Sequence, residues 1–89
     1  MEKIRVHYIF HGHVQGVGFR YKACYSARNR GVSGWVKNCS DGTVEMEAEG
    51  YAADIAAVVR ALDEHSWGCI ESIDSEIIPT EGGYGFEIQ

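Results

Sequence analysis

The order in which strand-like and helix-like hydrophobic patterns follow each other constrains the fold of this chain most strongly. Residues 3–11 alternate between apolar and polar positions, which is the period of a strand with one buried face. Residues 20–30 contain neither glycine nor proline, and an apolar stripe at a spacing of four begins at Phe19. Because glycine commonly follows a helix end, we expect this helix to stop at Gly31.

A hairpin and a second helix follow. Strands are expected at residues 32–38 and 43–49, separated by the turn residues Ser40-Asp41-Gly42. Apolar residues from Ala52 to Leu62 recur at spacings of three and four, which predicts an amphipathic helix ending near His65. The remaining expected elements are a strand with Ile70, Ile73 and Ile77 that ends at Pro79 and, after Gly82-Gly83, a short strand with Tyr84, Phe86 and Ile88.

This element order predicts an α+β protein of the ferredoxin-like class. The expected arrangement is βαββαβ with a short C-terminal strand, in which two helices cover one face of an antiparallel sheet. The 89 residues, 45% of them hydrophobic, are enough for one domain with a modest core, so we expect a single domain over residues 1–89. Ferredoxin-like folds host many functions, so the chemistry has to be inferred from a site.

The segment from Gly12 to Arg20 is the best candidate for such a site. Gly16 and Gly18 can adopt positive φ angles, so successive N–H groups of this loop can converge on one anion. The guanidinium of Arg20 adds planar, permanently charged donors that match phosphate oxygens. Without Arg20 an ordinary tight turn would be the better interpretation. The loop is neither a P-loop nor a dinucleotide-binding fingerprint, because it lacks the Gly-Lys-Ser/Thr sequence and a third glycine.

Three motifs together resemble the acylphosphatase family: Gly12-x-Val14-Gln15-Gly16-Val17-Gly18-Phe19-Arg20, Gly34-Trp35-Val36-Lys37-Asn38 and Asp41-Gly42-Thr43-Val44-Glu45. The resemblance implies a small ferredoxin-like enzyme that hydrolyses acyl phosphates without a metal, another cofactor or a covalent intermediate. It implies that Arg20 binds the phosphoryl oxygens and that Asn38 positions the attacking water. It further implies that backbone amides hold the phosphate, in a cradle formed by Val14, Gln15, Gly16, Val17, Gly18 and Phe19.

The chemistry of these residue types agrees with that reaction. Phosphoryl transfer requires mainly alignment of the nucleophile and stabilisation of charge on the phosphoryl oxygens, which loop amides and Arg20 can supply. Asn38 can hold a water molecule but cannot act as a general base, so the substrate phosphate has to help accept the proton. Acyl phosphates already carry a good leaving group, and they are therefore better candidate substrates than phosphate monoesters.

An alternative is a non-catalytic, anion-binding regulatory module on the same scaffold.

Two departures from the family pattern leave the proposed catalytic side chains untouched. His65-Ser66-Trp67-Gly68-Cys69 stands where many relatives have a Gly-Pro pair, and His13 occupies a variable position that is often arginine.

The charge balance restricts the partners. Thirteen acidic and eight basic residues give a net charge of −5, which disfavours nucleic acid and anionic membranes. The N-terminus lacks the apolar region of a signal peptide, and no segment approaches the ~20 apolar residues of a membrane helix. We therefore expect a cytoplasmic monomer that meets only a small acyl phosphate and its product, inorganic phosphate.

The other chemically versatile residues are expected to be bystanders. Three widely spaced cysteines suggest reduced thiols, and the His11-x-His13 pair lacks the further ligands of a metal site. The alternating acidic residues 45, 47 and 49 could form a carboxylate cluster, but a solvated strand face is simpler. We expect core or partly covered positions for the aromatic residues at 21, 25, 35 and 86. The residues concerned are Cys24, Cys39, Cys69, His11, His13, Glu45, Glu47, Glu49, Tyr21, Tyr25, Trp35 and Phe86.

Overall fold

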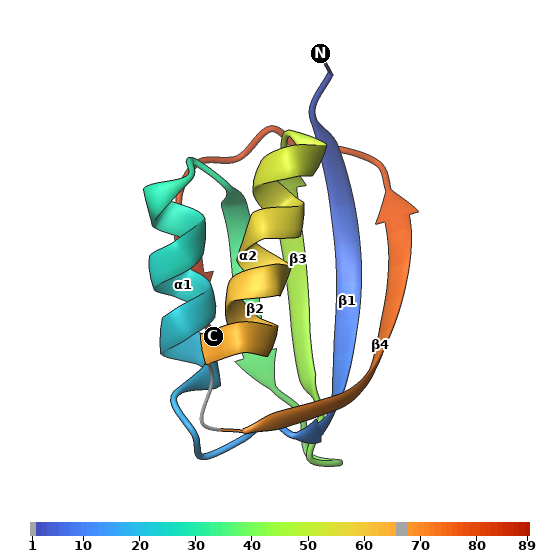
Figure 1. Cartoon of the computed structure of the whole chain (residues 1–89). Coiled ribbons are helices and arrows are strands. Elements are labelled where there is room, and N and C mark those ends of the chain that lie inside the picture. Colours follow the sequence, from blue (N-terminus) through green and yellow to red (C-terminus); the bar gives the residue numbers. More distant parts are fainter. Residues whose placement is uncertain (1, 66–67) are drawn as a thin grey trace.

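Two helices cover one face of a five-stranded sheet in the computed structural model, which describes residues 2–65 and 68–89 (Figure 1). Ser66 and Trp67, part of the departure noted above, lie outside the described residues. The elements are β1 (Ile4–His13), α1 (Phe19–Asn29), β2 (Ser33–Asn38), β3 (Val44–Gly50), α2 (Ala52–His65), β4 (Cys69–Ile78) and β5 (Phe86–Ile88).

The strands have the spatial order β4-β1-β3-β2-β5. All neighbours pair antiparallel except β5, which pairs in parallel with β2. This arrangement confirms the expected ferredoxin-like fold. Because β1 and β2 each run antiparallel to β3 on its two sides, they point in the same direction and end at the same end of the sheet. The loop after β1 is therefore brought close to the end of β2.

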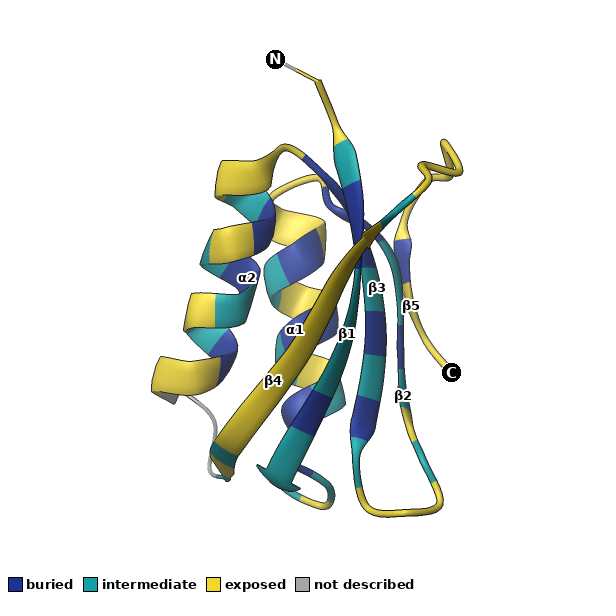
Figure 2. Ribbon diagram, turned by 90° about the vertical axis from the view of Figure 1, so that its right-hand side faces the viewer, coloured by how far each residue is buried: buried dark blue, intermediate teal, exposed yellow. Residues whose placement is uncertain are grey.

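The core lies between the sheet and the helices (Figure 2). Helix α1 buries the stripe that its sequence predicts, and the rings of Phe10 and Phe19 meet edge to face with centroids 5.1 Å apart. This contact fixes the first turn of α1 against β1, directly beside the candidate site. The other core positions include Val6, Ala23, Ala27, Val36, Val44, Met46, Ala48, Ile55, Val58, Leu62 and Phe86.

Several positions expected in the core are instead exposed. Tyr21 and Tyr25 each expose 74% of their surface, because α1 turns the small side chains of its Phe19 stripe toward the sheet and these tyrosines outward. Ala52 lies at the exposed start of α2, and Tyr84 is fully exposed before β5 begins. Trp35 is half-buried, which agrees with the expectation of a partly covered position.

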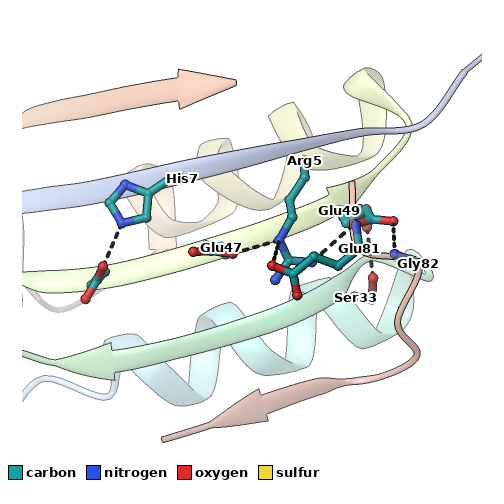
Figure 3. Close-up of polar contacts among 8 residues, drawn as sticks. Arg5, His7, Ser33, Glu47, Glu49, Glu81 and Gly82 are labelled. Atoms are coloured by element: carbon teal, nitrogen blue, oxygen red, sulfur yellow. Dashed lines mark hydrogen bonds and ion pairs between the residues drawn. The ribbon is translucent and has the colours of Figure 1, made fainter. Parts of the chain in front are cut away.

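The acidic face of β3 is not uniformly solvated, which corrects the expectation for Glu49. Arg5 and Glu49 are only 3% and 6% exposed, on the sheet face away from the helices (Figure 3). Arg5 Nε lies 2.7 Å from a Glu47 oxygen, and its Nη1 lies 3.2 Å from Glu49. Glu49 also accepts hydrogen bonds from the backbone N–H groups of Glu81 and Gly82. This network attaches the connector between β4 and β5 to the centre of the sheet.

Candidate active site

The glycine loop and the end of β2 meet at one end of the sheet. The loop between β1 and α1 and the β2–β3 turn lie at the same end in Figure 1. A small hollow of about 100 Å³ opens between them. Its lining brings Arg20 of α1 together with Asn38 of β2, which are separated by 18 positions in the sequence. The described lining consists of Val14, Gly16, Gly18, Phe19, Arg20, Tyr21 and Asn38.

The backbone of the loop has the geometry that the glycines predict. Gly16 and Gly18 have φ angles of 72° and 76°, in the left-handed region that favours glycine. Gly18 is also the residue that precedes the first turn of α1, and no side chain caps the helix there. No acidic residue occupies that first turn. The unpaired amides at this helix start thus leave a positive electrostatic potential beside the hollow, which favours an anion.

Arg20 and Asn38 are not engaged elsewhere within residues 2–65 and 68–89. Arg20 has no ion pair with a described carboxylate, and Asn38 makes no side-chain hydrogen bond to a described residue. Asn38 is held by its backbone, which pairs with Val44 at the end of β2. Both polar heads are therefore available to a ligand.

The side chain of Gln15 has a role that the sequence did not indicate. Its Nε2 donates to the backbone oxygens of Cys39 and Thr43, at 2.7 and 2.8 Å. Gln15 does not line the hollow, nor does Val17, which packs against the core instead. Gln15 thus ties the glycine loop to the turn that follows Asn38. No local pattern could have revealed this, because the partners lie 24 and 28 positions away.

The β2–β3 turn is itself well organised. One carboxylate oxygen of Asp41 accepts hydrogen bonds from the Thr43 hydroxyl at 2.6 Å and from the Thr43 backbone N–H at 3.0 Å. These bonds, the hydroxyl one foremost, lower the pKa of Asp41. The Cys39 N–H donates to the Thr43 oxygen, and the Gly42 N–H donates to Cys39. Gln15 therefore binds to a turn of defined shape.

Gly12, the first residue of the glycine motif, has a structural role in the pairing of β1 with β4. It sits at an irregularity in the β1–β4 pairing with a φ of 123°. A Cβ atom there would overlap the backbone oxygen of Cys69 and crowd the backbone of Glu71. Gly12 lets β4 approach β1 closely just before the loop begins.

His7 and His11 pair with carboxylates, and the cysteines form no disulfide. His11 Nε2 lies 2.8 Å from Asp74, and His7 Nε2 lies 2.6 Å from Glu45, a partner that the sequence did not suggest. The bond to His7 is the main reason why the pKa of Glu45 is lowered. In the described part of the chain, no three His, Cys, Asp or Glu residues are placed to hold a metal ion. All three cysteines are free thiols.

A larger hollow of about 450 Å³ lies at the other end of the molecule. It is lined by Lys3, the last turn of α1 and the glycine-rich connector before β5. Glu49, which lines it, is committed to Arg5 and to the connector backbone. The larger hollow also has Lys3 and Arg28 in its lining, but it includes the carboxylate of Glu49, whereas no described carboxylate lines the smaller hollow.

None of the helices described in residues 2–65 and 68–89 is long and apolar enough to cross a membrane.

Comparisons with known proteins identify relatives in sequence and in fold. The acylphosphatase family model matches residues 6–88. An acylphosphatase of Synechococcus sp. is 42% identical over 89 residues, covering 99% of this chain and 95% of the relative. An acylphosphatase of Bifidobacterium longum is 51% identical over 59 residues, which span 66% of this chain and 61% of that relative. The crystal structure of a Bacillus subtilis acylphosphatase superimposes with a TM-score of 0.91 at 36% identity, covering 97% of this chain and 98% of the other.

Fold and site together define a class: a ferredoxin-like protein with a glycine loop that leads into a helix, an adjoining arginine and a carboxamide on a strand that lines the same hollow. With the matches above, the chain belongs to the acylphosphatase family.

Proposed function

We propose that this protein hydrolyses the carboxyl–phosphate bond of small acyl phosphates, giving a carboxylate and inorganic phosphate. The observation that carries the proposal is the convergence of Arg20 and Asn38 on one hollow that also includes Gly16 and Gly18. Family membership supports the reaction type. No carboxylate lines this hollow among the described residues, so an incoming phosphate meets no like charge there.

Binding of the phosphoryl group falls to the loop and Arg20. The backbone amides of the cradle and the first turn of α1 surround the phosphate oxygens, and the guanidinium contributes two parallel donors. Charge-assisted hydrogen bonds contribute about 1.5–3 kcal/mol each, so several of them outweigh the repulsion from a distant net charge of −5. The same donors stabilise the charge that spreads over the oxygens in the transition state.

Asn38 positions the water. Its carboxamide accepts one hydrogen bond from the water and leaves the water oxygen aligned with phosphorus. As the water oxygen bonds to phosphorus, the bond from phosphorus to the acyl oxygen breaks and the carboxylate departs with the electron pair. The proton of the water passes to a phosphoryl oxygen, because the carboxamide has no basic group to take it.

The alternative is an anion-binding module without catalysis. One observation favours keeping it: the chain superimposes on 12% of a full-length HypF structure with a TM-score of 0.86 at 26% identity, so the same scaffold occurs within a larger protein. This alternative predicts that the protein binds phosphate but does not hydrolyse acyl phosphates.

Hydrolysis of benzoyl phosphate, followed with and without EDTA, tests the proposal. We expect turnover in both conditions, competitive inhibition by inorganic phosphate, and loss of turnover in Arg20→Ala. Arg60→Ala is the matched control, because Arg60 is exposed on α2 and does not line the hollow. Phosphate binding by the wild-type protein with no hydrolysis would contradict the enzyme and support the module.

We also propose that the protein works as a monomer in the cytoplasm. The net charge of −5 opposes self-association, and the three free thiols suit a reducing compartment. Light scattering after size-exclusion chromatography should give a mass near 9.9 kDa. A mass of twice that value at micromolar concentration would contradict the monomer.

A further inference from the structure

Helix α1 presents two aromatic side chains to solvent immediately after Arg20. Tyr21 and Tyr25 are four positions apart, so they are neighbours on one face of the helix, and each is 74% exposed. Large exposed aromatic surfaces in a small protein often mark a binding site. The core does not need these rings, because the opposite face of α1 supplies its packing.

A shallow groove runs beside these rings. It has a volume of about 200 Å³, and it is lined from α1 by residues that include Cys24 and from β5 by Ile88. Arg28 closes the end away from the candidate active site, where its Nε donates to the backbone oxygen of Phe86 at 3.2 Å. The described lining is Tyr21, Cys24, Tyr25, Arg28 and Ile88, without any carboxylate.

Tyr21 joins this groove to the phosphate hollow, because it lines both. In an in-line displacement the leaving group lies opposite the attacking water. The water is assigned to Asn38 on β2, whereas Tyr21 lines the same hollow from a different element, α1. A phosphoryl group held between them can therefore direct its acyl group along Tyr21 into the groove.

We propose that the groove formed by Tyr21, Cys24, Tyr25, Arg28 and Ile88 is the acyl-group subsite, and that it selects acyl phosphates with flat, apolar acyl groups. The inference rests on the proposed function. Aromatic rings stack favourably on tyrosine, and Ile88 adds apolar contact from β5. An acyl group of two carbons ends near Tyr21 and gains nothing from Tyr25, so the groove discriminates by length and by ring character.

A comparison of the turnover of two substrates tests the subsite. The measured quantity is the ratio of kcat/KM for benzoyl phosphate to kcat/KM for acetyl phosphate. In Tyr25→Ala we expect this ratio to fall about fivefold to tenfold, because the contact between the substrate ring and the Tyr25 ring is lost. Tyr25→Phe should keep the ratio near that of the wild type, because the ring and not the hydroxyl makes the contact. The affinity for inorganic phosphate should not change in either variant, since Tyr25 does not line the hollow.

Tyr84→Ala is the matched control, because Tyr84 is fully exposed and lies outside the groove. Its ratio should equal that of the wild type. If the wild type hydrolyses both substrates and Tyr25→Ala keeps the ratio, the subsite is wrong and the proposed function stands. If the wild type hydrolyses neither substrate, the proposed function fails and the subsite with it.

Discussion

The amide nitrogen of Gln15 lies 2.8 Å from the backbone oxygen of Thr43, and this contact joins the two halves of the candidate active site. A second bond from the same nitrogen reaches Cys39, the residue after Asn38. The loop proposed to hold the phosphate and the strand that carries Asn38, the proposed water-positioning residue, are thereby fixed relative to each other. Such alignment is what an enzyme without a general base depends on.

Removing the amide of Gln15 should weaken both stability and catalysis. In Gln15→Ala two hydrogen bonds are lost, so we expect the free energy of unfolding to fall by about 1–3 kcal/mol. We expect kcat/KM to fall about tenfold or more, because Asn38 and the loop no longer keep their spacing. Urea unfolding and steady-state kinetics measure the two effects. Gln89→Ala is the control, since the Gln89 backbone bond to Val36 survives that change. Full activity in Gln15→Ala would show that this contact does not align the site.

Arg20 should not be replaceable by lysine. A lysine ammonium is a point charge that cannot form the paired bonds of a guanidinium, so Arg20→Lys should lose kcat/KM on the order of 10³-fold, almost as much as Arg20→Ala. Neither variant should lose stability, because Arg20 pairs with no carboxylate in the described residues. Arg60→Lys, measured in parallel, should keep the kinetics of the wild type. A lysine variant with wild-type turnover would refute paired binding by Arg20.

Asn38 should affect turnover more than phosphate affinity. We expect Asn38→Ala to lower kcat on the order of 10²-fold, as for removal of one group that orients the transition state, while the inhibition constant of phosphate stays within about twofold. Asn29→Ala, an exposed asparagine at the end of α1, serves as control. Loss of phosphate affinity with unchanged turnover of bound substrate would reassign Asn38 from the water to the phosphate.

The buried Arg5 network should dominate stability at the opposite end of the sheet. Arg5→Ala leaves Glu47 and Glu49 without their cation, so we expect a loss of about 3–5 kcal/mol in the free energy of unfolding. Arg30→Ala removes an exposed pair with Asp54 and should cost less than about 1 kcal/mol. Chemical denaturation compares the two variants. Equal losses would mean that burial does not strengthen the Arg5 pairs.

Glu49 should give part of the acid sensitivity. The backbone N–H of Glu81, then that of Gly82, and then Arg5 lower the pKa of Glu49 in the folded protein. A lowered folded-state pKa stabilises the protein above the unfolded-state value, about 4.3, and this stabilisation is lost as the pH falls through the lower folded value. Urea midpoints measured from pH 6 downward should therefore fall less steeply in Glu49→Gln. Glu76→Gln, at an exposed position, should follow the wild type, and identical slopes in all three proteins would contradict this assignment.

The local sequence predicted the helices and strands well. Its errors concern burial that depends on contacts between distant parts of the chain. The alternation in β1 and the stripe from Phe19 correctly identified which side chains enter the core. The same kind of pattern could not show whether another element covers the outward face of α1, where Tyr21 stays 74% exposed. Nor could it separate Glu49 from its neighbours on β3, since its burial requires Arg5 and a connector more than 30 positions away.

The sequence by itself determined the order of strands and helices, the positive φ angles of the glycine loop, and the residue types that suit a phosphate dianion. Those properties reside in single residues and short repeats. Only the tertiary structure decided that Arg20 and Asn38 line one hollow and that Tyr21 borders two hollows. It also decided that the side chain of Gln15 hydrogen-bonds to the β2–β3 turn. These relationships arise from strand pairing and helix packing, which join residues distant in the chain and leave no local pattern.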